Sequence, residues 1–300
     1  MEYKTEPFEH QRKEVERSAR KEAWGLFLEM GVGKSKPTLD TAAVLEEANE
    51  IDALIIVAPK GGHRNWLKKD GGQVATHLPQ ELADRSTSHI WHAGKSRTIW
   101  HKEAVASLLK EKFPILGTTY SASMTDAGSK YLRDFLKERR CMFVLDESPQ
   151  IKTPGAKRTK FFHTISAKAP YRRILTGMPA EESPFDLYSQ IRFLNKEAWH
   201  PLGIRSAAAF RATFGEWEER YTSQQGGRVY KSLVEYRNMD ILRKMMESYG
   251  SRFQKSDVLD LPRKLYTKRH FEMLPKQRRI YDDLRRDYET EMERGTLTAE

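Results

Sequence analysis

Short apolar runs alternate with longer helix-like stretches through the first two thirds of the chain, and this alternation constrains the fold more than any other feature. Each run is rich in strand-forming residues and is bounded by charged or turn residues, which predicts a β-strand. The runs occupy residues 24–28, 53–58, 88–92, 113–119, 141–146 and 172–177. Strands that alternate with helices form a parallel sheet with helices on both faces. We therefore expect an α/β fold that binds its ligands at the carboxyl ends of the strands.

The pattern changes after Asn195, where the regular alternation of strands and helices stops. The later sequence predicts helices over 205–221, 239–250 and 275–295, a loop or short hairpin over 222–232, and a strand over 264–273. No second series of strands and helices is visible in it. We expect residues 1–195 to form the sheet domain and residues 196–300 to form a mainly helical elaboration packed on it.

The stretch from Gly31 to Ser35 has the composition of a phosphate-binding loop, and it lies between a predicted strand and a predicted helix. Gly31 and Gly33 allow backbone N–H groups to turn toward an anion, and the helix that starts near Lys34 adds its dipole. In this interpretation Lys34 reaches the β- and γ-phosphates of ATP, and Ser35 binds Mg²⁺. Leu28 stands where the full G-x-x-x-x-G-K-[ST] pattern has its first glycine, so an ordinary glycine turn is the alternative.

Two adjacent carboxylates, Asp146 and Glu147, follow the apolar run at 141–146. Neighbouring negative charges repel each other unless a cation neutralises them. We expect Asp146 to hold Mg²⁺, directly or through water, and Glu147 to act as the general base on the attacking water. A solvated strand end is the alternative, but the combination with the glycine loop favours a catalytic pair.

The composition indicates which binding partners and which cellular compartment to expect. A net charge of +10 spread over 300 residues attracts polyanions, among which nucleic acid is the commonest, although a generic solvated surface is the alternative. Cys141 is the only cysteine, which excludes an internal disulfide and a cysteine-cluster zinc site and fits a reducing cytoplasm. No apolar run approaches the ~20 residues of a membrane span, so we expect no membrane partner.

Several stretches together resemble the first ATPase lobe of a Swi/Snf-type member of helicase superfamily two, especially the compact forms of phages and bacteria. The resemblance runs from about residue 8 to about residue 288, in the family's order. The stretches that carry it occupy residues 8–15, 28–35, 54–66, 115–121, 144–160, 172–194 and 252–284. The resemblance implies a RecA-like fold and ATP hydrolysis coupled to movement on double-stranded DNA.

The resemblance also implies roles for single residues. It suggests that Gln11 recognises the adenine of ATP and that Thr176 and Gly177 link the ATP site to DNA. The loop that contains Lys60 and Arg64 would lie against the DNA backbone. The residues expected to contact DNA in the next such loop are Thr118 and Thr119.

This chain departs from the family pattern at three places. The DEAH box of the family reads Asp146-Glu147-Ser148-Pro149 here, so the histidine that usually helps couple the ATP site to neighbouring motifs is absent, and Met178 replaces a threonine. Nothing after Leu284 resembles the second lobe, which in these motors carries arginines that complete the ATP site. We therefore expect a fragment or a chain that needs a second lobe from a partner, with weak activity in isolation.

Three functions follow from these patterns. The leading one is the ATP-binding lobe of a DNA translocase or helicase in the cytoplasm of a bacterial or phage-infected cell. The second is a subunit of an RNA-directed or restriction-type helicase. The third is a nucleotide-gated DNA-binding module without motor activity.

Overall fold

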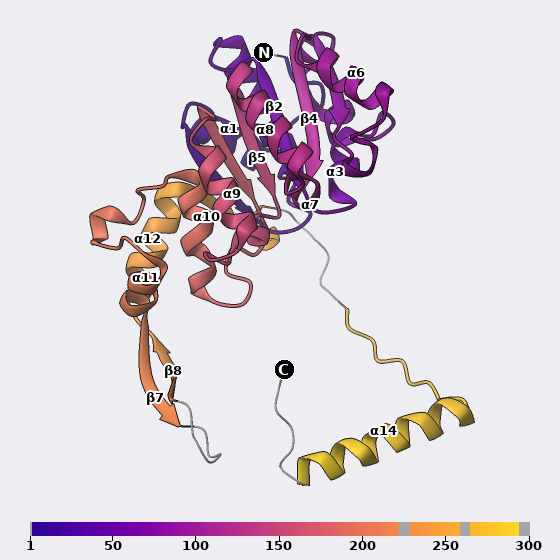
Figure 1. Cartoon of the computed structure of the whole chain (residues 1–300), viewed down its shortest axis with the longest axis vertical. Helices are drawn as coiled ribbons and strands as arrows, with labels where there is room; N and C mark the ends of the chain where they lie inside the picture. The colour runs from indigo at the N-terminus through magenta and orange to yellow at the C-terminus, as the bar shows by residue number, and fades with distance from the viewer. Residues whose placement is uncertain (1, 222–228, 259–264, 294–300) are drawn as a thin grey trace. The chain divides into compact units, whose positions relative to one another are not determined.

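The computed structural model describes residues 2–221, 229–258 and 265–293, with side chains as far as residue 287. The chain divides into two compact units, Met1–Asp260 and Leu261–Glu300. The first unit contains the sheet (Figure 1), and the described part of the second contains one helix, α14 (Pro275–Glu293). None of the described helices is both long and apolar enough to cross a membrane.

A seven-stranded sheet forms the centre of the first unit. Its strand order is β3-β4-β2-β5-β6-β1-β9, and every neighbouring pair is parallel. The strands are β1 (Ala23–Leu28), β2 (Ala53–Ala58), β3 (Ser86–Ile90), β4 (Phe113–Thr119), β5 (Cys141–Asp146), β6 (Tyr171–Leu175) and β9 (Gly250–Phe253). The expected parallel α/β sheet is confirmed, and its first six strands correspond to the six apolar runs.

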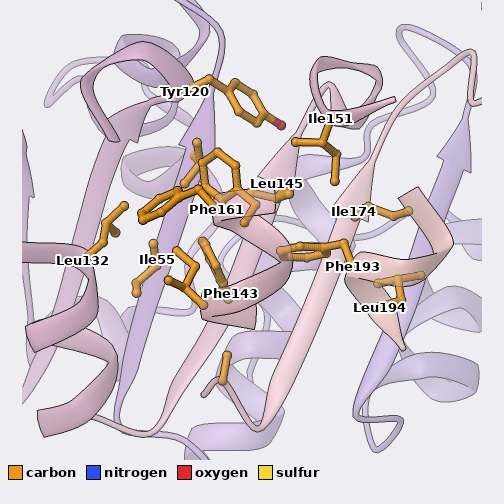
Figure 2. Close-up of a cluster of buried hydrophobic side chains, with 14 of the residues drawn as sticks. Ile55, Tyr120, Leu132, Phe143, Leu145, Ile151, Phe161, Ile174, Phe193 and Leu194 are labelled. Carbon is orange, nitrogen blue, oxygen red and sulfur yellow. The ribbon is translucent and has the colours of Figure 1, made fainter. Parts of the chain in front are cut away.

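Helices cover both faces of this sheet because its central strands are apolar on both sides. Along β5 the side chains alternate: Phe143 and Leu145 pack into one hydrophobic cluster, and Met142 and Val144 pack into the other. Figure 2 shows the first cluster, to which α8, α9 and α10 contribute. The α-helices of the first unit are α1 (Glu9–Ser18), α2 (Ser35–Glu47), α3 (Gly62–Leu67), α4 (Gln73–His77), α5 (Gln80–Ala83), α6 (Ile99–Leu108), α7 (Tyr120–Ser123), α8 (Asp126–Glu138), α9 (Lys157–Ser166), α10 (Leu187–Leu194), α11 (Ala207–Phe214), α12 (Met239–Tyr249) and α13 (Lys255–Val258).

The seventh strand, β9, corrects the expected organisation of the chain. It returns to the sheet and pairs with β1, with Gly25 opposite Gly250. A Cβ atom on Gly250 would lie 2.5 Å from the carbonyl oxygen of Gly25, so the strands can approach only because this residue is glycine. The sheet therefore includes residues beyond 195, and the division between compact units lies near residue 260.

An antiparallel hairpin replaces part of a predicted helix. The helix predicted over 205–221 ends at Phe214, and the hairpin of β7 (Gly215–Tyr221) and β8 (Val229–Tyr236) follows it (Figure 1). Cross-strand pairs such as Glu219 with Lys231 stabilise the strands. Of the loop or short hairpin predicted over 222–232, residues 222–228 lie outside the described residues and residues 229–232 belong to β8. The strand predicted over 264–273 is not formed, since residues 265–273 have no regular secondary structure.

One buried ion pair interrupts the apolar packing of α2. Lys36 and Asp40 lie one helical turn apart, and Lys36 Nζ donates to both carboxylate oxygens of Asp40 at 2.8 and 2.7 Å. Their side chains are only 4% and 0% exposed. The ammonium group also lies 4.7 Å from the centre of the Tyr3 ring, so the N-terminal segment covers the pair.

Candidate nucleotide-binding site

The loop between β1 and α2 turns through two left-handed glycines. Gly31 has φ +85° and Gly33 has φ +88°, a region that side-chain-bearing residues rarely adopt. Gln11 of α1 holds the loop, because its Nε2 donates to the carbonyl oxygen of Gly33 at 3.1 Å. A Cβ atom on Gly33 would lie 2.3 Å from that nitrogen. Gln11, expected at the adenine, therefore contacts the loop itself in this structure.

The strand β9 reaches the same loop from the other side. The backbone N–H of Glu29 donates to Phe253 at 3.0 Å, and the carboxylate of Glu29 accepts from the backbone N–H of Lys255 at 2.8 Å. A Cβ atom on Gly31 would lie 3.1 Å from Cε of Lys255. The glycine loop is thus enclosed between α1 and the segment after β9.

The structure brings Lys34 and the two acidic residues together. Lys34 Nζ donates to the carbonyl oxygen of Leu28 at 3.1 Å. Burial lowers the pKa of Lys34, and the nearby carboxylates of Glu147 and Asp146 act in the opposite direction. The carboxyl ends of β1 and β5 therefore lie at the same edge of the sheet, with β6 between them, and bring the glycine loop near the acidic pair. A cavity of about 440 Å³ next to Glu147 is lined by Met30, Glu147 and Thr176, among others, but its lining does not include Lys34 or Asp146.

Both oxygens of the Asp146 carboxylate have hydrogen-bond donors. Trp66 Nε1 donates to Oδ2 at 2.8 Å, and the backbone N–H of Glu147 donates to Oδ1 at 3.1 Å. Burial raises the pKa of Asp146, and the hydrogen bond from Trp66 opposes that shift. Trp66 is buried, and no pattern in the sequence indicated its bond to Asp146.

Glu147 occupies an unusual backbone conformation. Its φ of 52° and ψ of 62° are left-handed, which is uncommon for a residue other than glycine and is found repeatedly at functional sites. Burial raises the pKa of Glu147, and the negative charge of Asp146 raises it further. Both effects move this carboxyl group toward the pKa of an effective general base.

The donor set at this place fits a magnesium ion carried by a nucleotide. Among the described residues no group of three or more His, Cys, Asp or Glu side chains could hold a metal alone. Mg²⁺ usually takes one or two protein oxygens, with the other ligands supplied by phosphates and water. The hydroxyl group of Ser35 at the start of α2 and the carboxylate of Asp146 are such oxygens.

The segment after β6 packs directly against the glycine loop. The backbone N–H of Thr176 donates to the carbonyl oxygen of Leu26 at 3.1 Å, and the Thr176 hydroxyl accepts from the backbone N–H of Met178 at 3.1 Å. A Cβ atom on Gly177 would lie 3.1 Å from the backbone nitrogen of Met30. Thr176 and Gly177 thus pack against β1 and the glycine loop.

Ser148, which directly follows the acidic pair, begins a buried chain of hydrogen bonds. Its hydroxyl donates to Oε1 of Gln190 at 2.6 Å. Gln190 Nε2 then donates to the carbonyl oxygens of Pro179 at 2.6 Å and Asp186 at 2.9 Å. Gln190, which sequence reasoning missed, connects the segment after β5 with the segment after β6.

Replacing Gln190 with alanine is expected to lower the free energy of unfolding by about 1–3 kcal/mol, because buried polar partners such as the hydroxyl of Ser148 lose their bonds. Urea denaturation measures this loss. Gln80→Ala is the matched control, since exposed Gln80 bonds Asp84 one turn away on a short surface helix. That variant should change stability by less than about 0.5 kcal/mol. Equal losses in both variants would contradict the structural role of Gln190.

The residues predicted to contact DNA divide into exposed and buried ones. Lys60 and Arg64 are exposed, the first just before α3 and the second on it. Thr119 is partly buried and caps α7 by accepting from the backbone N–H of Ala122 at 3.1 Å. Thr118 is only 1% exposed, so its side chain does not reach the surface. This corrects the prediction for Thr118 and leaves the other three available to a partner.

Known proteins resemble this chain over nearly its whole length. The profile of the SNF2-related domain matches residues 11–300. ATP-dependent helicase FUN30 of Saccharomyces cerevisiae is 25% identical over 85% of this chain, and ATP-dependent helicase fft3 of Schizosaccharomyces pombe is 26% identical over 85%. The chain spans 21% and 25% of the lengths of these two relatives.

A solved structure shares the fold. The Sulfolobus solfataricus SWI2/SNF2 ATPase core in complex with double-stranded DNA aligns with 99% of this chain at a TM-score of 0.60 and 20% identity. The alignment covers 55% of that structure. The fold is that of the first RecA-like lobe, and the chain belongs to the SNF2-related domain family.

Proposed function

We propose that this chain is the ATP-binding lobe of an ATP-dependent translocase or helicase that acts on double-stranded DNA. The observation that carries the proposal is the placement of Lys34, which lies close enough to Asp146 and Glu147 for their charges to act on it. The names of the helicase relatives and the DNA in the related ATPase core support the same function.

Each residue of the site has a role in this proposal. The N–H groups around Gly31 and Gly33 bind phosphate oxygens, and Lys34 directs its charge toward the β- and γ-phosphates. Ser35 and Asp146 hold Mg²⁺, which would neutralise phosphate charge. Glu147 accepts the proton of the attacking water. The contact between Gln11 and adenine stays a prediction.

The proposal includes a second RecA-like lobe, in cis or in trans. The chain covers about a quarter or less of the length of the two helicase relatives. An arginine from a second lobe is worth about 10³–10⁵-fold in related phosphoryl-transfer sites. We therefore expect slow turnover by the chain alone. The bacterial or phage origin and the cytoplasmic location also stay predictions.

Lys34→Ala should weaken ATP binding by about 10- to 100-fold, because a hydrogen bond to a charged group contributes about 1.5–3 kcal/mol. Titration with a fluorescent ATP analogue in the presence of Mg²⁺ measures the affinity. Lys110→Ala, which removes an exposed lysine after α6, is the control and should bind as tightly as the unchanged chain. Unaltered affinity in the Lys34 variant would refute a phosphate role for the loop.

Duplex DNA binding should weaken steeply with salt and show no sequence preference. The double change of Lys60 and Arg64 to alanine should reduce the slope of log K against log salt by about 2, one for each lost phosphate contact. Fluorescence anisotropy with a labelled duplex measures both quantities. The double change of Lys110 and Lys112 removes the same charge near the opposite ends of the strands and should keep the slope. Stimulation of ATP hydrolysis by RNA rather than by duplex DNA would favour the RNA-directed alternative.

A further inference from the structure

Two hydrogen bonds reach Asp146 from the two segments proposed to face DNA. Trp66 of α3 donates from Nε1 to the side-chain Oδ2 of Asp146 at 2.8 Å. Tyr120 of α7 donates from its hydroxyl to the backbone carbonyl oxygen of Asp146 at 2.8 Å. Both donor side chains are only 2% exposed, so neither can contact DNA itself.

The Trp66 bond ties the acidic pair to a short helix that can respond to a phosphate. Arg64 is exposed and lies two residues before Trp66 on the six-residue helix α3. Gly61 precedes that helix with φ +99°, and nothing lies within 4 Å of the place where its Cβ would be. Arg64 and Trp66 lie on one short helix, so a phosphate bound by Arg64 would act on the element that carries the indole.

The Tyr120 bond connects the acidic pair to the second loop proposed to face DNA. Thr119 caps α7, and Tyr120 is the first residue of that helix. The Tyr120 ring packs edge-on against Phe162 with their centres 5.4 Å apart, and it lies in the hydrophobic cluster of Figure 2. Its hydroxyl also lies 3.4 Å from the carbonyl oxygen of Glu147. The ring thus transfers a movement of this loop to the left-handed backbone at Glu147.

We infer that Trp66 and Tyr120 are positioning residues that transmit the binding of duplex DNA to the acidic pair at the nucleotide site. Trp66 sets the orientation of the Asp146 carboxylate, and Tyr120 sets the backbone from which Glu147 projects. Neither residue touches nucleotide or DNA. The inference rests on the proposed function, because it assumes that both ligands bind to this chain.

The test measures coupling between the two ligands, because the same two bonds could serve folding alone. The quantity is the factor by which saturating duplex changes the affinity of the full chain for a non-hydrolysable Mg²⁺–ATP analogue. Coupling is reciprocal, so the nucleotide must change duplex affinity by the same factor, which gives an internal check. Trp66→Phe and Tyr120→Phe each remove a donor and keep a ring of similar shape.

The chain supplies a matched control for each variant. Trp199 is buried and donates from Nε1 to the carbonyl oxygen of Tyr188 at 3.1 Å, so Trp199→Phe removes the same bond far from the acidic pair in sequence. Tyr131 is buried and donates to the carbonyl oxygen of Val105 at 3.0 Å, so Tyr131→Phe controls for the loss of a tyrosine hydroxyl. Thermal unfolding of all four variants separates loss of fold from loss of coupling.

We expect duplex to change nucleotide affinity about 5- to 150-fold in the unchanged chain, the usual range of coupling. Trp66→Phe and Tyr120→Phe should bring that factor close to 1 while each ligand alone still binds, and the two controls should keep it. Full coupling in both test variants, or an equal loss in the controls, overturns the inference. So does an unchanged chain that binds both ligands independently, although the proposed function then stands. Failure of the unchanged chain to bind either ligand counts against the proposed function itself.

Discussion

Glu147→Gln will lower the rate of ATP hydrolysis by about 10²- to 10⁴-fold and leave ATP affinity within a few fold, because glutamine keeps the shape of the side chain but cannot accept a proton. Burial and the negative charge of Asp146 raise the pKa of Glu147, so its carboxylate accepts a proton more readily than that of an exposed glutamate. Single-turnover measurements with excess protein detect hydrolysis even when turnover by the chain alone is slow. The same loss should follow in any longer form that contains the second lobe.

Glu181→Gln is the matched control for this experiment. Glu181 lines the same cavity as Glu147, and its carboxylate pairs with Lys152 at 3.3 Å. The control should hydrolyse ATP at nearly the rate of the unchanged chain. Equal losses in the two variants would show that the negative charge of the cavity matters, and not proton transfer at Glu147.

Asp40→Ala will lower the free energy of unfolding by about 3–5 kcal/mol, because it leaves the ammonium group of Lys36 buried without its counterion. Both side chains lie inside the packing between α2 and the N-terminal segment. Burial raises the pKa of Asp40, and the hydrogen bond from Lys36 opposes that shift. Lys36 therefore stabilises the charged form of the buried Asp40 carboxylate. Urea denaturation monitored by circular dichroism measures the loss.

Two further variants test whether the lost counterion is the cause. The double change Lys36→Met with Asp40→Leu removes both charges and should restore stability to near or above that of the unchanged chain. Glu9→Ala breaks an exposed pair with Lys13 at the same helical spacing and should cost less than about 1 kcal/mol. A double variant as unstable as Asp40→Ala would mean that packing volume, and not charge, explains the effect.

Most of the strands that were predictable from sequence bury both faces, and the partly exposed edge strand β3 is the exception. A strand that buries both faces can be predicted from its own apolar run without knowing which strands pair with it, because a strand inside a parallel sheet is apolar throughout. β9 was missed because its four residues, Gly250–Phe253, include a glycine, a serine and an arginine, which do not form an apolar run. The segment is a strand because it pairs with β1. Residues 215–221 were mistaken for helix because their strand is stabilised by cross-strand partners in β8.

The candidate site was predictable where its chemistry is local in sequence. Glycines before Lys34 and carboxylates after a buried strand are short patterns, and their meeting follows from the parallel sheet. The hydrogen bond from Trp66 to Asp146 joins residues 80 apart, and the bond from Ser148 to Gln190 joins residues 42 apart. Nothing in either local pattern indicates which distant partner satisfies a buried polar group.

The pairing of β9 with β1 determines how mechanical tension would enter this protein. The two strands run parallel, and the backbone N–H of Glu29 donates to the carbonyl oxygen of Phe253 where the glycine loop begins. A pull on the polypeptide after Phe253 along the strand axis would load the hydrogen bonds of this pair in shear, all at once, instead of opening them one by one. Force applied there would reach the glycine loop directly, because Glu29 at the start of that loop is bonded to Phe253.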